Sequence, residues 1–121
     1  MGLAALIVGG FWASGELAKV ERTRVAVAVG FDTTRRCEPT HPLLISFKNN
    51  SNKTLSYVSF SVHAKRPGYS SDTYSDYLLS SDKILRPGEV HLGCWGFKSY
   101  QKPDAPSGLE WSAQVSTVYF Q

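Results

Sequence analysis

Two cysteines, Cys37 and Cys94, are the only thiols in the chain, so few kinds of thiol chemistry are open to it. They are too few to hold a zinc ion by themselves, and no CxxC pair is present. Two distant cysteines in a strand-rich chain with an apolar N-terminal segment are typical of one disulfide in an oxidising compartment. We therefore expect a Cys37–Cys94 disulfide, worth about 4 kcal/mol in the chain-entropy model. Two separate buried thiols are the alternative.

Three histidines, His41, His63 and His91, are the other candidates for metal binding or acid–base chemistry. A metal site would need two or three of them to converge with a carboxylate. His41 lies in a proline-containing loop, and we place His63 and His91 on outward faces of strands. The sequence also lacks the GxSxG motif of many serine hydrolases. We predict no metal site, no cofactor, no catalytic residue and no enzyme activity.

A stretch rich in tyrosine, serine and aspartate, residues 69–82, has the composition of a recognition loop. Tyrosine supplies a large contact area at a low cost in conformational entropy. We predict a partner-binding surface made of Tyr69, Tyr74 and Tyr77, joined by Trp95 if the loops gather at one end of the domain. The alternative is that these rings cover the edge of a sheet or pair across strands.

Short β-strands are the elements that must position these residues. Alternation of apolar and polar side chains, with many β-branched residues, recurs along the chain from residue 23 onward. Proline, glycine and asparagine clusters separate the alternating segments, and Arg86-Pro-Gly-Glu89 matches a type II turn. The predicted strands cover residues 23–31, 43–48, 54–65, 90–97 and 109–120, with two weaker ones at 74–79 and 83–85. This pattern predicts an all-β fold, an antiparallel sandwich of about seven strands.

The length and the charge set limits on the function. The chain has 121 residues, enough for one domain, and its formal net charge is +3 at pH 7. The basic residues are spread along the chain rather than gathered in a stripe, and no nucleic-acid-binding motif is present. We therefore expect no nucleic-acid partner.

Residues 2–13 form an uncharged apolar segment, GLAALIVGGFWA. It is shorter than the roughly 20 residues that span a bilayer, but it suits the apolar part of a signal peptide, although no Lys or Arg precedes it. Three interpretations remain open: the end of a membrane anchor, a signal peptide, or a buried helix of the domain. We favour an anchor or a signal peptide, and divide the chain into a hydrophobic helical segment, 1–20, and a sandwich domain, 21–121. The side chains expected to contact lipid are Leu3, Leu6, Ile7, Val8, Phe11 and Trp12.

Three segments carry a family resemblance: LISFKNNSNKTL at residues 44–55, VSFSV at 58–62 and LRPGE at 85–89. With them, residues 23–121 resemble the small immunoglobulin-like domains of bacterial extracytoplasmic proteins that stand behind a single membrane anchor. The resemblance implies an immunoglobulin-like β-sandwich and brings no catalytic residue with it. The cysteine pair and the tyrosine-rich stretch depart from the simplest such domains.

Together these observations predict a non-enzymatic binding or interaction module in the periplasm, anchored to the inner membrane or secreted. Its expected partner is a protein of the cell envelope, with the chain as an accessory subunit of a membrane or envelope complex. The alternative is a small-ligand or carbohydrate-binding domain that uses Trp95, Tyr69, Tyr74 and Tyr77 as stacking platforms.

Overall fold

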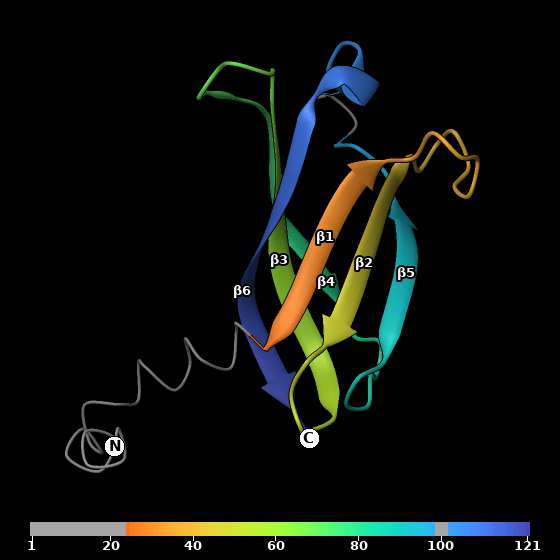
Figure 1. The fold of residues 1–121 in the computed structure, drawn as a ribbon, viewed down its shortest axis with the longest axis vertical. Helices are drawn as coiled ribbons and strands as arrows, with labels where there is room; N and C mark the ends of the chain where they lie inside the picture. Colours follow the sequence, from red (N-terminus) through yellow and green to blue (C-terminus); the bar gives the residue numbers. More distant parts are fainter. Residues whose placement is uncertain (1–23, 99–101) are drawn as a thin grey trace, which may run out of the picture.

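The computed structural model describes residues 24–98 and 102–121 and confirms the all-β prediction (Figure 1). The described residues form six strands rather than about seven, and one short 3₁₀ turn, η1 (Pro106–Gly108). None of their helical segments is long and apolar enough to cross a membrane. The predicted N-terminal helix and its lipid-facing residues lie outside the described ranges. The strands are β1 (Val25–Phe31), β2 (Leu43–Asn49), β3 (Leu55–Lys65), β4 (Asp72–Ser81), β5 (Val90–Trp95) and β6 (Glu110–Phe120).

The strands make two antiparallel three-stranded sheets, which we name by their central strands. The β2 sheet has the order β1-β2-β5, and the β3 sheet has the order β4-β3-β6. The turn at residues 50–54 crosses from one sheet to the other, and β1 lies beside β6 along one edge of the molecule (Figure 1).

The core lies between the two sheets, and alternate residues along each strand face it. Phe47 of β2 meets Phe60 of β3 edge to face, with ring centroids 5.2 Å apart, so the two central strands are packed directly on each other. The fully buried apolar residues come from both sheets: Leu43, Ile45, Phe47, Leu55, Val58, Phe60, Val62 and Ala64.

The two ends of the molecule differ in what they carry. Arg24, where the described chain begins, lies at the same end as Gln121, together with the turns at 50–54 and 82–89 (Figure 1). We call this the terminal end. The opposite end, the loop end, carries the connection 32–42, the turn 66–71 and the described parts of the connection between β5 and β6.

A β-bulge explains why residues 69–82 showed no clean period. Phe60 pairs with Leu79 and Val62 with Asp76, so the single residue Ser61 faces both Tyr77 and Leu78. The bulge shifts the alternation by one residue, and the side chain of Asp76 accepts a hydrogen bond from the Leu78 N–H at 3.2 Å. The predicted strand at residues 83–85 is only a single bridge between Leu55 and Leu85.

The buried side chain of Asn49 ties the turns of the terminal end together. Its Nδ2 donates to the carbonyl oxygens of Lys53 at 2.7 Å and Leu85 at 2.9 Å. Its Oδ1 accepts from the N–H of Ser51 at 3.0 Å and from the Ser51 hydroxyl at 2.6 Å. The neighbouring turn has Gly88 at φ 83°, as the predicted type II turn requires.

Candidate functional site

The predicted disulfide is present at the loop end and joins Cys37 to Cys94, with their Cα atoms 5.6 Å apart. Cys94 lies on the outer face of β5, and Cys37 lies in the connection between β1 and β2. The bond therefore holds the whole 32–42 connection against the end of the β2 sheet.

Asp32 organises the same connection from within. Its carboxylate accepts hydrogen bonds from the Cys37 N–H at 2.7 Å and from the N–H and hydroxyl of Thr34 at 3.0 and 2.8 Å. The Cys37 N–H lowers the pKa of Asp32 below 3.8, because that bond favours the charged form. The stabilisation is therefore complete above pH 3.8 and is lost as the pH falls through the lowered pKa. Arg35 within this turn takes a φ of 62°, which is uncommon for a residue other than glycine.

A pocket of about 680 Å³ opens between this connection and the residues that follow β5. Its volume lies within the usual range for small-ligand sites. The lining residues come from both sides: Phe31, Asp32, Thr33, Arg35, Cys37, Glu38, Pro39, Thr40, Pro42, Phe97, Lys98, Lys102 and Pro106.

The aromatic floor of the pocket is fixed by packing below it. Phe31 stacks on Phe97 with ring centroids 6.5 Å apart, and Phe97 stacks on Trp111 at 5.9 Å. Tyr74 meets the edge of Phe97 at 5.5 Å, and its hydroxyl accepts a hydrogen bond from the Lys98 N–H at 3.1 Å. Burial raises the pKa of Tyr74, so the hydroxyl stays a neutral member of this cluster at ordinary pH. The floor is therefore a rigid apolar surface.

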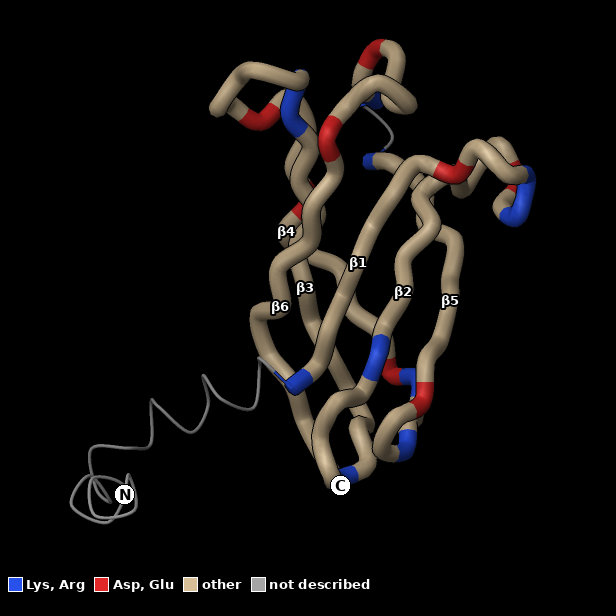
Figure 2. The backbone as a smooth tube through the Cα atoms, viewed as in Figure 1, with Lys and Arg blue, Asp and Glu red and all other residues tan. Residues whose placement is uncertain are grey.

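The rim of the pocket carries more unpaired positive than negative charge. Arg35, Lys98 and Lys102 are the cations, and within the described part of the chain none of them forms an ion pair. The carboxylates of Asp32 and Glu38 also line the pocket, so the three cations exceed the acidic residues by one. Figure 2 shows that charged residues gather at the ends of the molecule, this end included. The pocket thus combines an apolar floor with a positive rim.

The four aromatic residues predicted to bind a partner do not come together. Tyr74 is 3% exposed and belongs to the core, and Trp95 packs edge-on against Phe60 with its indole N–H buried and without an acceptor. Tyr69 is exposed under the Arg66 guanidinium, which lies 3.8 Å from its ring centroid. Tyr77 is exposed on β4. The sequence analysis did not identify Phe31 and Phe97 as residues of the pocket. Their only signal was position: Phe31 ends β1, shortly before Cys37, and Phe97 follows the end of β5, shortly after Cys94.

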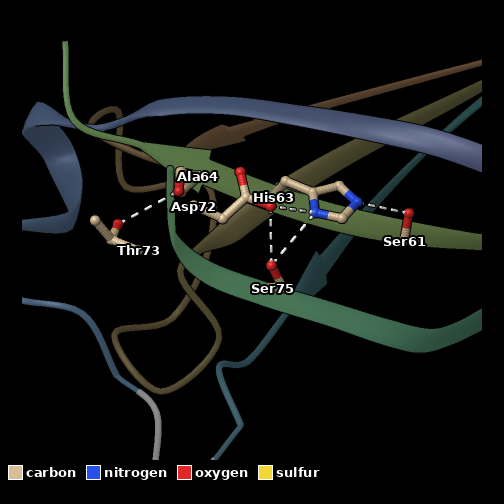
Figure 3. A network of polar contacts seen from close by, with 6 residues as sticks. All are labelled: Ser61, His63, Ala64, Asp72, Thr73 and Ser75. Carbon is tan, nitrogen blue, oxygen red and sulfur yellow. Dashed lines mark hydrogen bonds and ion pairs between the residues drawn. The ribbon is translucent and has the colours of Figure 1, made fainter. Parts of the chain in front are cut away.

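A polar network that the sequence analysis did not anticipate lies on the outer face of the β3 sheet (Figure 3). Ser61 Oγ lies 2.9 Å from His63 Nε2, and Asp72 Oδ2 lies 3.0 Å from His63 Nδ1. The Ser75 hydroxyl donates to Asp72 at 3.1 Å and lies 3.4 Å from His63 Nδ1. The only signal in the sequence was the i, i+2 spacing of Ser61 and His63, which puts both on one face of a strand.

This connectivity is that of a Ser-His-Asp set, but its surroundings favour a positioning role. Ser61 is only 4% exposed, and β3 is a central strand, so its backbone N–H groups face neighbouring strands rather than a substrate carbonyl. In the tautomer protonated on Nδ1, the ring donates to Asp72 and accepts from Ser61, so both nitrogens are used. The network therefore locks the orientation of His63.

The other histidines are placed apart from this network. His91 was expected on an outward face. It is the cross-strand partner of the buried Phe47, however, and the two rings stack with centroids 6.3 Å apart, so His91 faces inward. His41 lies beside Thr40 in the loop-end connection. Among the described residues no group of three His, Cys, Asp or Glu side chains is arranged to hold a metal ion.

Comparisons with protein-family models, with curated proteins and with solved structures gave no match to this chain.

Proposed function

We propose that the chain is a non-enzymatic, extracytoplasmic binding module that receives a segment of a partner protein in its loop-end pocket. The observation that carries the proposal is the pocket itself. It is preformed, has an apolar floor and a charged rim, and lies between a disulfide-held connection and a packed aromatic cluster. Sites of this kind, concave and apolar with a few polar groups, are where proteins hold ligands.

The position of the pocket suits an anchored domain. Strand β1 begins beside Arg24 at the terminal end and finishes at Phe31, which lines the pocket (Figure 1). If residues 1–20 hold the chain to the inner membrane, the sandwich projects the pocket away from the lipid. The disulfide fits this location, because such bonds persist in oxidising compartments such as the periplasm.

The strand order supports an immunoglobulin-like fold as part of this proposal. The orders β1-β2-β5 and β4-β3-β6 match strands A-B-E and C′-C-F of an immunoglobulin-like sandwich. By this assignment the loop end carries the A–B, C–C′ and E–F connections, and the B–C turn, residues 50–54, lies at the terminal end.

The chemistry of the pocket indicates which segment it would receive. Phe31 and Phe97 offer an apolar contact, and the cations Arg35, Lys98 and Lys102 surround it. A segment with a bulky apolar side chain next to one or more carboxylates fits both features. An envelope protein that offers such a segment would make this chain an accessory subunit of its complex. An acidic small molecule with an aromatic or aliphatic group is the second candidate, because the pocket volume is in the range for such ligands.

Site-specific photo-cross-linking in cells that express the full chain tests this proposal. A cross-linker at Lys102, on the pocket rim, is expected to give a discrete protein adduct, whereas one at Lys83, exposed at the terminal end, is not. Arg35→Glu is expected to reduce the Lys102 adduct about tenfold or more, because a charge reversal at a specific contact costs several kcal/mol and a tenfold change needs only about 1.4 kcal/mol.

Arg86→Glu is the matched control, since it reverses an exposed charge at the terminal end and should leave the adduct unchanged. Equal adducts from positions 102 and 83, or an adduct that Arg35→Glu does not affect, would contradict binding at the pocket. No protein adduct, together with a bound acidic small molecule in the purified protein, would favour the second candidate.

A further inference from the structure

We infer that the outer face of the β3 sheet is a second binding surface, and that it binds a neutral glycan chain. This face lies on the three strands β4, β3 and β6 and does not include the loop-end pocket. The inference does not depend on the proposed partner of the pocket.

Exposed aromatic rings stand at two places along this face. Tyr57 and Tyr119 are cross-strand partners near the terminal end and stack with ring centroids 5.3 Å apart, and Tyr119 is 60% exposed. Tyr77 and His63 meet edge to face at 5.2 Å nearer the loop end, and Tyr77 is 63% exposed. Tyr57 and His63 are six residues apart on β3, roughly 20 Å at the usual rise of a strand. The two places therefore suit an extended ligand rather than a compact one.

Hydroxyl and amide groups lie along the face between the rings, and the exposed Leu78 lies beside them in the bulge opposite Ser61. The register of β3 with its neighbours sets Ser59 opposite both Ser80 and Thr117, and Ser61 opposite Gln114. Further along, His63 lies opposite Ser75 and Ser112. These groups both donate and accept hydrogen bonds, as the hydroxyls of a sugar do.

The face carries no charge between its two aromatic places. On the strands of this sheet, Lys65, Asp72 and Glu110 lie at the loop end, and the remaining charged residue, Asp76, is buried (Figure 2). The outer face of the β2 sheet is also nearly uncharged, but it presents Ala26, Ala28, Val90 and Leu92 with a single hydroxyl, that of Ser46, and no aromatic ring. Only the β3 sheet thus matches a neutral ligand that has apolar ring faces and polar edges.

The inferred glycan site gives the polar network of Figure 3 a role, which is to position an aromatic ring. Because Ser61, Asp72 and Ser75 hold the imidazole of His63, the ring is a fixed support for Tyr77. The bulge opposite Ser61 places Tyr77 on this outer face while Tyr74 and Asp76 stay inside. Preorganised rings lower the entropy cost of stacking against a ligand. His63 and Asp72 are therefore positioning residues for the Tyr77 platform.

A calorimetric titration of the full chain, in a detergent without a sugar headgroup, tests the inference. The probes are hexasaccharides of β1,4-linked glucose and of β1,4-linked N-acetylglucosamine, with hexagalacturonate as the acidic counterpart. We expect at least one neutral hexasaccharide to bind and the acidic one not to bind. Tyr119→Ala and Tyr77→Ala should each weaken binding about tenfold or more, because each removes an aromatic contact.

Matched variants make the result specific. Tyr119→Phe keeps the ring and should retain most of the affinity, and Tyr69→Ala removes an exposed tyrosine outside the face and should leave it unchanged. Absence of binding by both neutral probes would overturn the inference. Binding that Tyr119→Ala spares but Arg35→Glu abolishes would overturn it as well and would place the sugar in the pocket. A protein adduct from a cross-linker at Ser112, exposed on β6 opposite His63, would show that a protein occupies the face instead.

Discussion

Removal of the Cys37–Cys94 disulfide is expected to lower the free energy of unfolding by about 4 kcal/mol, because the bond restricts a long loop of the unfolded chain. For a domain of this size, the corresponding fall in Tm is roughly 15 to 30 °C. The measurement is urea unfolding of the oxidised protein and of the Cys37→Ser, Cys94→Ser double variant, followed by tryptophan fluorescence. The double variant avoids leaving one reactive thiol.

The same variant should lose its ligand even where it is still folded. The disulfide and the Asp32 carboxylate both hold the 32–42 connection, and that connection forms one wall of the pocket. Wild-type protein treated with reductant is the control, and it should behave like the double variant. A change in unfolding free energy below about 1 kcal/mol would mean that the bond does not restrict the unfolded chain as assumed.

Asn49→Ala is expected to destabilise the domain by about 2–4 kcal/mol, although it removes no apolar contact. The side chain is completely buried, and its amide makes four hydrogen bonds. Without it, the N–H of Ser51 has lost its acceptor and the Leu85 carbonyl has lost one of its two donors. Each buried polar group left unsatisfied costs about 1–3 kcal/mol.

Two further variants separate the hydrogen bonds from the turn itself. Asn52→Ala changes an exposed residue of the same turn and should alter stability by less than about 0.5 kcal/mol. Asn49→Asp should destabilise at least as much as alanine, because a carboxylate would face the two carbonyl oxygens that now accept from Nδ2. Equal urea midpoints for the Asn49→Ala and Asn52→Ala variants would refute this role of Asn49.

The strands were largely predictable because their inner and outer faces differ strongly. In β3 the buried residues Val58, Phe60, Val62 and Ala64 alternate with polar ones, and the sequence shows that period directly. Residues 69–82 were ambiguous because the Tyr77–Leu78 bulge breaks the period and places Asp76 inside. The inward direction of His91 was not predicted either. His91 and Leu92 are consecutive, so they point to opposite faces, and the sequence alone does not show which of the two faces the core.

The candidate sites were less predictable than the strands, because they depend on register and on the packing of the two sheets. Aromatic type alone could not separate Tyr74, which is a core residue, from Tyr77, which is exposed three positions later. The pocket needs residues about 65 positions apart, such as Phe31 and Phe97, to meet at one end. The hydrogen bond between His63 and Asp72 follows from the β3–β4 pairing, which the sequence left open.

Two surfaces of different chemistry thus arise from one small fold. The loop end offers a positive, apolar-floored pocket, and the outer face of the β3 sheet offers rings and hydroxyls without charge. The proposed protein segment and the inferred neutral glycan would not compete for one site, because the two surfaces share no residue.

The most direct test of the central claim, a disulfide-held binding domain outside the cytoplasm, is membrane fractionation of the full chain with thiol labelling before and after reduction. The account predicts that the protein is recovered with the membranes or secreted, and that Cys37 and Cys94 are labelled only after reduction. Soluble cytoplasmic protein with both thiols free would contradict the location, the disulfide and the anchor together.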